Sequence, residues 1–203
     1  MTYLSPAKIN LFLHVTSKRP DGYHNLQTIF QLLDYCDEIS LDYREDGIIN
    51  RLSGNESIPQ DQDLAIRSAT ILKKMTGSKG GVDIGIAKKI PMGGGLGGGS
   101  SNAATVLIAL NKLWSLNLSK EKLMHIGQNL GADVPVFVNC HSSWGEGIGE
   151  ILTPITLPKY FYLIVSIDKH ISTKEIFTHK ALTMSPVQMR IANFSMVYNP
   201  HND

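Results

Sequence analysis

A glycine-rich segment stands between an alternating apolar stretch and a run of apolar residues at helical spacing. Glycine adopts positive φ at low cost and lets backbone N–H groups approach a ligand closely. The first turn of a helix leaves its N–H groups unpaired and carries partial positive charge, so a phosphate group fits there. We therefore predict a nucleotide-phosphate site, with Ser100 and Ser101 adding hydroxyls for phosphate oxygens or a magnesium ion. The segment consists of Pro91, Met92, Gly93, Gly94, Gly95, Leu96, Gly97, Gly98, Gly99, Ser100 and Ser101.

Three other interpretations of this segment are weaker. A flexible linker would not be framed by a strand and an apolar helix. The loop of the P-loop nucleotidases is excluded, because no Gly-Lys-Ser/Thr follows the glycines. The spacing of Gly95, Gly97 and Gly98 keeps a dinucleotide-binding oxidoreductase open, but no acidic residue ends the next strand.

An acid follows in Gly131-Ala132-Asp133-Val134-Pro135, between a predicted helix and an apolar run. A buried carboxylate without a partner is costly, so Asp133 should have a cation nearby. Lys8 is the obvious candidate. The alternative is a simple helix-to-strand turn in which Asp133 accepts hydrogen bonds from local backbone N–H groups.

Aromatic residues stand at two further places where a planar ring could be bound. Tyr23 and His24 follow the turn residues Asp21 and Gly22, and Phe177 stands alone in the C-terminal part. Taken singly, the turn is typical of a surface and Phe177 of a core.

Both strands and helices are predicted to position these residues. Apolar residues alternate over 7–15, which predicts a strand with Lys8 and Asn10 on one face, away from the core. Further strands are predicted over 26–33, 38–43, 82–86, 134–140 and 160–167. Helices are predicted over 63–75, 103–114, 121–130 and 173–181, with Ser119 capping the third of these.

Composition limits the class of protein. A chain of 203 residues holds one large domain, or one domain and part of another, and its net charge of +1 favours neither nucleic acid nor an anionic membrane. Cys36 and Cys140 are expected to be free thiols of a reducing compartment. No apolar run reaches membrane-spanning length. We expect a cytoplasmic protein, monomeric or weakly dimeric, that binds small molecules.

These motifs, with Pro6-Ala7-Lys8-Ile9-Asn10-Leu11, occur in the order and spacing of one family, and over residues 5–177 the chain resembles the GHMP kinases. The doubled glycine triplet and the Gly-Tyr-His turn are similar to the branch that acts on a cytidine diphosphate-linked methylerythritol. The resemblance implies a transferase of isoprenoid (terpenoid) biosynthesis. It would move the γ-phosphoryl group of ATP to the 2-hydroxyl of that substrate, with Mg²⁺. We assign no metal-ligating residue of the protein.

The resemblance also implies roles for single residues. Asp133 matches the catalytic aspartate that accepts the hydroxyl proton, and Lys8 matches the lysine paired with it. Asn10 matches a substrate-side residue beside Lys8. On the adenine side, Leu64 and Lys88 match pocket positions, and Asp63 stands where an asparagine is common.

The cytidine end of the substrate is assigned in the same way. Tyr23 and Phe177 match an aromatic pair that sandwiches the cytosine, and His24 matches the residue that reads its edge by hydrogen bonds. Thr173 matches a position beside the substrate diphosphate or sugar.

The implied fold class is α+β, with two domains. Residues 1–155 would form an ATP-binding domain like the second domain of ribosomal protein S5. Residues 156–203 would form an incomplete ferredoxin-like domain, because the family's third glycine-rich motif has no counterpart here. We therefore expect a C-terminally truncated kinase, with residues after about 158 mobile or exposed. An inactive nucleotide-binding remnant is the alternative to an active enzyme.

Overall fold

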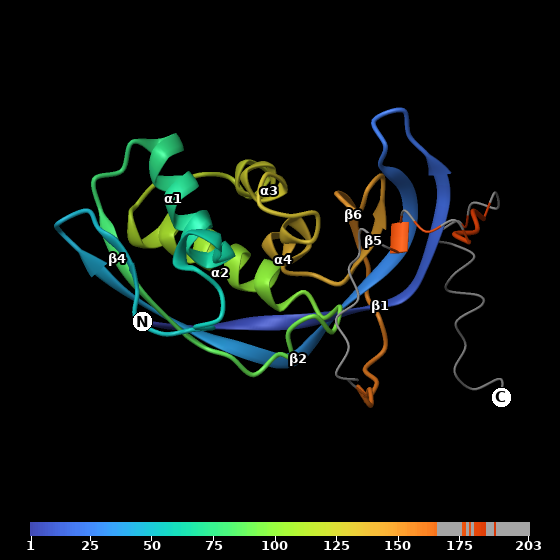
Figure 1. Ribbon diagram of the computed structural model, residues 1–203, viewed down its shortest axis with the longest axis horizontal. Coiled ribbons are helices and arrows are strands. Elements are labelled where there is room, and N and C mark those ends of the chain that lie inside the picture. Colours follow the sequence, from blue (N-terminus) through green and yellow to red (C-terminus); the bar gives the residue numbers. More distant parts are fainter. Residues whose placement is uncertain (166–175, 178, 180, 186–188, 190–203) are drawn as a thin grey trace.

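The computed structural model describes residues 1–165, 176–177, 179, 181–185 and 189. It shows a mixed six-stranded sheet whose one face is covered by α-helices (Figure 1). The strands are β1 (Thr2–Lys18), β2 (His24–Arg44), β3 (Ile49–Arg51), β4 (Gly81–Ala87), β5 (Ser143–Glu146) and β6 (Ile151–Pro154). The helices are η1 (Gln60–Gln62), α1 (Leu64–Thr76), α2 (Gly98–Leu113), α3 (Lys120–Gln128) and α4 (Val134–Asn139). The α+β class is confirmed.

Strand β2 is the centre of the sheet. It pairs antiparallel with β1 along most of its length, and also with β4 and β5, whereas β3 pairs with β4 in parallel. The separate strands predicted over 26–33 and 38–43 are parts of this one strand. The residues between them, 34–37, contain neither glycine nor proline, so nothing in their chemistry interrupts the strand.

Helix α2 provides the middle of the hydrophobic core. Its residues Ala103, Val106, Leu107 and Leu110 are completely buried. They pack in one cluster with strand residues such as Ile84 and with α1, α3 and α4. The predicted helical spacing after the glycines is therefore confirmed.

Two helices begin after a residue whose side chain caps them, and of these two caps the one at Ser119 was predicted. Asp63 precedes α1 and accepts a hydrogen bond from the backbone N–H of Ala65 at 2.9 Å. Ser119 precedes α3 and accepts one from Lys122 at 3.3 Å. Such caps contribute about 1 kcal/mol each because they satisfy N–H groups that have no partner inside the helix.

The strand predicted over 134–140 is wrong, because residues Val134–Asn139 form helix α4. All six of these residues are buried, so their continuous apolar run carries no periodicity that separates a strand from a helix. Pro135 lies in the first turn, where proline's missing N–H costs nothing. Cys140 ends the helix in the left-handed conformation, with a φ of 61°.

The strand predicted over 160–167 is also wrong as far as residue 165, because residues 160–165 belong to no strand or helix. The side chains of Phe161, Leu163 and Val165 are exposed. The exposure expected after residue 158 thus holds for these three. In the helix predicted over 173–181, residues 176 and 177 are helical, and most of the remainder lies outside the described residues.

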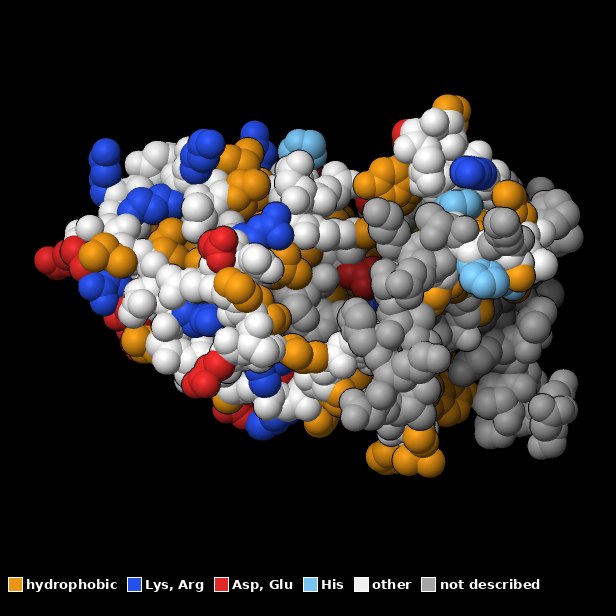
Figure 2. All heavy atoms as spheres, in the orientation of Figure 1, with side chains coloured by type: hydrophobic (Ala, Val, Ile, Leu, Met, Phe, Trp, Pro, Cys, Tyr) orange, Lys and Arg blue, Asp and Glu red, His pale blue; other side chains and the backbone are white. Residues whose placement is uncertain are grey.

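The surface of the described part has no large single-sign field on the face in view, where acidic and basic side chains are interspersed over the helices (Figure 2). Among the described residues, no helix has the length and apolar character needed to cross a membrane.

Burial along α1 gives a test of the fold. Leu72 is completely buried and Met75 is 49% exposed, although both stand in the same helix. We expect Leu72→Ala to lower the free energy of unfolding by about 2–5 kcal/mol, because it leaves a cavity in the core. Met75→Ala should change it by about 0.5 kcal/mol or less. Urea unfolding followed by circular dichroism measures both, and equal losses would contradict this packing.

Candidate active site

Strand β1 carries Lys8 into the helix-covered side of the sheet. The β1–β2 register shifts between Pro6 and Lys8, and Ser5 and Lys8 both contact residues on the helix side. The expectation that Lys8 lies away from the core is therefore wrong, because this irregularity breaks the alternation of faces. The backbone N–H of Lys8 also donates to the carbonyl of Leu96 at 3.0 Å, which fastens the glycine-rich loop to the strand.

The ion pair expected between Lys8 and Asp133 is present. Lys8 Nζ lies 3.3 Å from Asp133 Oδ2, and it donates a hydrogen bond to Asn10 Oδ1 at 2.7 Å. The Lys8 side chain is 8% exposed and that of Asp133 is 35% exposed. Asp133 is the N-cap residue of α4 but makes no capping hydrogen bond with its side chain. The alternative of a purely local turn role for Asp133 therefore loses its main support.

The glycine-rich loop leads into α2 through left-handed backbone. Gly93, Gly95 and Gly97 have φ of 72°, 72° and 71°. The first bond of the helix runs from the N–H of Ser101 to the carbonyl of Gly97, and no side chain caps this helix end. The N–H groups of the residues between them are therefore directed out of the helix end, where an anion fits.

The loop, the ion pair and the Asp133 turn meet at this helix end. A Cβ atom on Gly97 would lie 2.7 Å from the Phe137 ring and 3.3 Å from Lys8 Cε. A Cβ atom on Gly131 would lie 3.6 Å from Ser100 Oγ, so the hydroxyl of Ser100 borders the turn that carries Asp133. The predicted phosphate site and the predicted catalytic pair are thus neighbours.

The two serines of the loop point in different directions. Ser101 is completely buried, and its Oγ accepts a hydrogen bond from the hydroxyl of Ser5 at 2.8 Å. Ser100 is half-buried and borders the turn before α4. Of the two hydroxyls, the structure leaves that of Ser100 beside the candidate site.

The residues predicted for the adenine side flank the same helix end. A Cβ atom on Gly99 would lie 3.5 Å from Leu64 Cδ1, and one on Gly98 would lie 3.2 Å from Lys88 Nζ. The Lys88 ammonium forms an ion pair with Asp37 and donates to Asn102 Oδ1 at 3.1 Å.

Asp37 and Asn102 were missed by sequence reasoning. Asp37 is completely buried, and it accepts hydrogen bonds from the backbone N–H groups of Lys89 at 2.7 Å and Ile90 at 2.8 Å. Burial raises the pKa of this carboxyl, but hydrogen bonds from Lys88, from the two backbone groups and from Asn102 outweigh it, so the pKa lies below its ordinary value. A single acid within a strand pattern gives no sequence signal of such a role.

Of the residues predicted to bind cytidine, the structure brings together His24 and Phe177. Their rings stack with centroids 5.6 Å apart and an interplanar angle of 27°. Tyr23 is 60% exposed beside His24. Thr173 lies outside the described residues.

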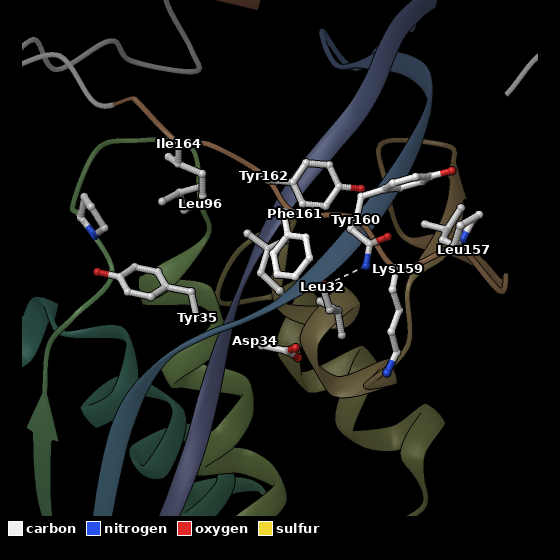
Figure 3. A pocket seen from close by; sticks show the side chains of 14 residues that line it. Leu32, Asp34, Tyr35, Leu96, Leu157, Lys159, Tyr160, Phe161, Tyr162 and Ile164 are labelled. Atoms are coloured by element: carbon white, nitrogen blue, oxygen red, sulfur yellow. Dashed lines mark hydrogen bonds between the residues drawn. The ribbon is translucent and has the colours of Figure 1, made fainter. Parts of the chain in front are cut away.

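A cavity of about 810 Å³ lies beside the glycine-rich loop (Figure 3). Pro91 and Leu96 of the loop form part of its wall, together with Tyr35 of β2 and the side chain of Phe161. Its charged lining residues are Asp34 and Lys159, and neither contacts Lys8 or Asp133 in any described ion pair. Lys8 and Asp133 are not among the residues that line this cavity, so the predicted catalytic pair lies outside it. Among residues 1–165 and the few described after them, no cluster of three or more His, Cys, Asp or Glu could hold a metal ion.

Comparison with known proteins gives the family of this chain. Residues 63–141 match the family model described as GHMP kinases N terminal domain. The 4-diphosphocytidyl-2-C-methyl-D-erythritol kinase of Ruthia magnifica subsp. Calyptogena magnifica is 59% identical over 202 residues, which cover 100% of this chain and 71% of that protein. The kinase of the same name from Cupriavidus metallidurans is 50% identical, with 96% of this chain and 67% of that protein covered.

Solved structures of kinases are also similar to this chain. A crystal structure of 4-(cytidine 5'-diphospho)-2C-methyl-D-erythritol kinase matches with a TM-score of 0.69 and 39% identity, over 78% of this chain and 56% of that one. This chain therefore covers little more than half the length of that solved kinase. Methanococcus jannaschii mevalonate kinase, at 15% identity and a TM-score of 0.55, shares the fold. This chain belongs to the 4-diphosphocytidyl-2-C-methyl-D-erythritol kinase family of GHMP kinases, which are small-molecule kinases.

Proposed function

We propose that this chain phosphorylates the 2-hydroxyl of 4-diphosphocytidyl-2-C-methyl-D-erythritol with ATP, in the non-mevalonate route to isoprenoids. The observation that carries the proposal is the Lys8–Asp133 ion pair beside the uncapped start of α2. The names of the relatives supply the substrate.

The proposed chemistry follows from the exposure of the pair. Asp133 is partly exposed, so a substrate hydroxyl can reach it and give up its proton. The hydroxyl oxygen then forms a bond to the γ-phosphorus, the bond from that phosphorus to the β–γ bridging oxygen breaks, and ADP leaves. Lys8 is nearly buried and held by Asn10, so its charge is fixed beside the reacting oxygens. Positioning and fixed charge carry most of such a transfer.

The ATP phosphates would lie on the backbone N–H groups at the start of α2, between Leu64 and Lys88. The open left-handed loop and the absence of a side-chain cap fit this role. Magnesium bound with ATP supplies charge neutralisation on the phosphates. Ser100 is the residue of this chain whose hydroxyl is suited to face it.

The cytidine end of the substrate would bind at the His24 and Phe177 rings. Stacking of a base on aromatic side chains contributes about 1–3 kcal/mol. We propose that Tyr23, which is exposed beside them, closes on the base from the other side, and that Thr173 contacts the diphosphate or sugar.

For the domains, we propose a unit of residues 1–155 like domain 2 of ribosomal protein S5, followed by a ferredoxin-like unit from residue 156. Strand β6 ends at Pro154, close to this boundary. Because the substrates are small and water-soluble, we propose a cytoplasmic enzyme, monomeric or weakly dimeric.

A second candidate is an ATP-binding protein without turnover. The exposure of Phe161, Leu163 and Val165 favours this candidate. These apolar side chains are not packed, and they stand in the segment that leads to Thr173 and Phe177, which are proposed to bind the second substrate. ADP release measured with Mg-ATP and the cytidyl substrate separates the two candidates. Release that depends on both compounds supports the kinase, and binding of ATP without release supports the second candidate.

The role of Asp133 is tested by Asp133→Asn. We expect kcat to fall about 10²–10⁴-fold, because the proton acceptor is removed, while the affinity for ATP stays nearly unchanged. Asp42→Asn is the control, since Asp42 is exposed at the far end of β2 and pairs with the N-terminal amine at 3.6 Å. Lys8→Met combined with Asp133→Asn should cost little more than either change alone. Full activity of Asp133→Asn would refute the proposed base.

The glycine-rich loop is tested by Gly97→Val and Gly98→Val. We expect calorimetry to detect no ATP binding, because the Gly97 side chain would collide with Phe137 and Lys8, and that of Gly98 with Ile90 and Lys88.

Gly77→Val is the matched control for backbone strain. Gly77 has a φ of 70°, close to the 71° of Gly97, but a Cβ atom there meets nothing within 4 Å. It should lower stability without weakening ATP binding. Equal ATP affinity in all these variants would place the phosphates elsewhere.

A further inference from the structure

A buried carboxylate lies beneath the start of α2 and takes no part in the proposed phosphoryl transfer. Asp37, in the middle of β2, is completely buried. Its Oδ1 accepts from the backbone N–H groups of Lys89 and Ile90, and its Oδ2 accepts from Asn102 Nδ2 at 2.9 Å and from Lys88. The carboxylate therefore connects the segment that enters the glycine-rich loop with the helix that leaves it, and Oδ2 accepts from both.

The network continues to β1. Asn102 Nδ2 also donates to Ser5 Oγ at 2.9 Å, and the Ser5 hydroxyl donates to Ser101 Oγ at 2.8 Å. Ser5 stands three residues before Lys8 on the same side of the sheet. One connected set of buried groups thus ties β1, β2 and the residues on either side of the glycine-rich loop to one another.

A gain in stability does not by itself explain why the buried Asp37–Lys88 ion pair and its network are present. A buried ion pair is often no more stabilising than apolar residues of the same volume, since both charges lose their hydration. A buried network in which every polar group has a partner holds its members in one rigid geometry. Here the network holds the Lys88 ammonium beside the start of α2, because a Cβ atom on Gly98 would lie 3.2 Å from Lys88 Nζ.

We propose that Asp37 is a positioning residue for the nucleotide triphosphate, which holds the Lys88 ammonium and the first turn of α2 in the geometry that binds phosphate. This inference rests on the proposed ATP site. Asp37 acts through Lys88, Asn102 and the backbone of residues 89–90, and does not itself touch the nucleotide. Its loss should weaken ATP binding selectively, because the cytidine end of the other substrate is bound by different residues.

The test is Asp37→Asn in the full chain. The asparagine replaces one carboxylate oxygen by an NH₂ group, so the two donors that bind this oxygen lose their acceptor. Glu38→Gln is the matched control, because Glu38 follows in the same strand and pairs with Lys89 at 2.6 Å, but on the exposed surface. Titration calorimetry with a non-hydrolysable Mg-ATP analogue and, separately, with the cytidyl substrate gives both dissociation constants.

We expect Asp37→Asn to weaken the ATP analogue at least 10-fold and the cytidyl substrate less than 3-fold, at a temperature where the variant is folded. Glu38→Gln should change neither by more than 2-fold. A folded Asp37→Asn that binds the analogue like the unmodified chain overturns the inference. Equal weakening of both ligands also overturns it, because that is the result of a general structural role.

Should Asp37→Asn fail to fold, Asn102→Ala provides the second test. It disconnects α2 from Asp37 but leaves the Asp37–Lys88 ion pair, and the same selective loss for the ATP analogue is expected. Unchanged ATP affinity in folded Asn102→Ala would overturn the inference. Failure of the proposed ATP site gives a different result. The unmodified chain would then bind no ATP analogue in the calorimeter, and Gly98→Val would not change the titration.

Discussion

The candidate site depends on keeping two ammonium groups beside the positive end of a helix. Lys8 and Lys88 both approach the first turn of α2, where the helix dipole is itself positive. Without a bound anion these charges repel one another, so each lysine needs a carboxylate partner. Asp133 and Asp37 provide them, and they differ in one respect: Asp37 is completely buried, whereas the Asp133 side chain is 35% exposed. The buried partner is suited to holding geometry, and the accessible one to exchanging a proton.

The long strand β2 makes this arrangement possible. Its C-terminal half pairs with β4 and its N-terminal half with β5, and β1 pairs with it along most of its length. Asp37 stands close to where these partners change, next to the segment that enters the glycine-rich loop. Lys8 is carried by the neighbouring strand, so the two lysines approach the same helix end from a shared sheet. A sheet is stiffer than a loop, which is what a site for phosphoryl transfer requires.

Sequence reasoning succeeded where a local signal existed. The cap at Ser119 and the apolar periodicity of α1 and α2 follow from local patterns. The ion pair of Lys8 with Asp133 follows from the cost of burying a carboxylate without a cation. It failed over 134–140, where an apolar run buried on all sides has no period.

The other failures have a common physical cause. The burial of Lys8 depends on a register shift between β1 and β2, and the role of Asp37 depends on partners 51 or more residues away in sequence. Neither feature can be predicted from the residues next to it in sequence. An irregular strand pairing and a long-range polar contact depend on how the sheet and the helix pack together.

Helix α2 shows how the fold sustains a site that weakens its own local structure. The helix opens with two glycines, each of which costs about 1 kcal/mol relative to alanine, and it lacks the side-chain cap that α1 and α3 possess. Its first turn would be poorly stable in isolation. The following turns compensate, because Ala103, Val106, Leu107 and Leu110 are completely buried in the core. The C-terminal part of the helix therefore stabilises it, and this frees the N-terminal backbone to bind a ligand.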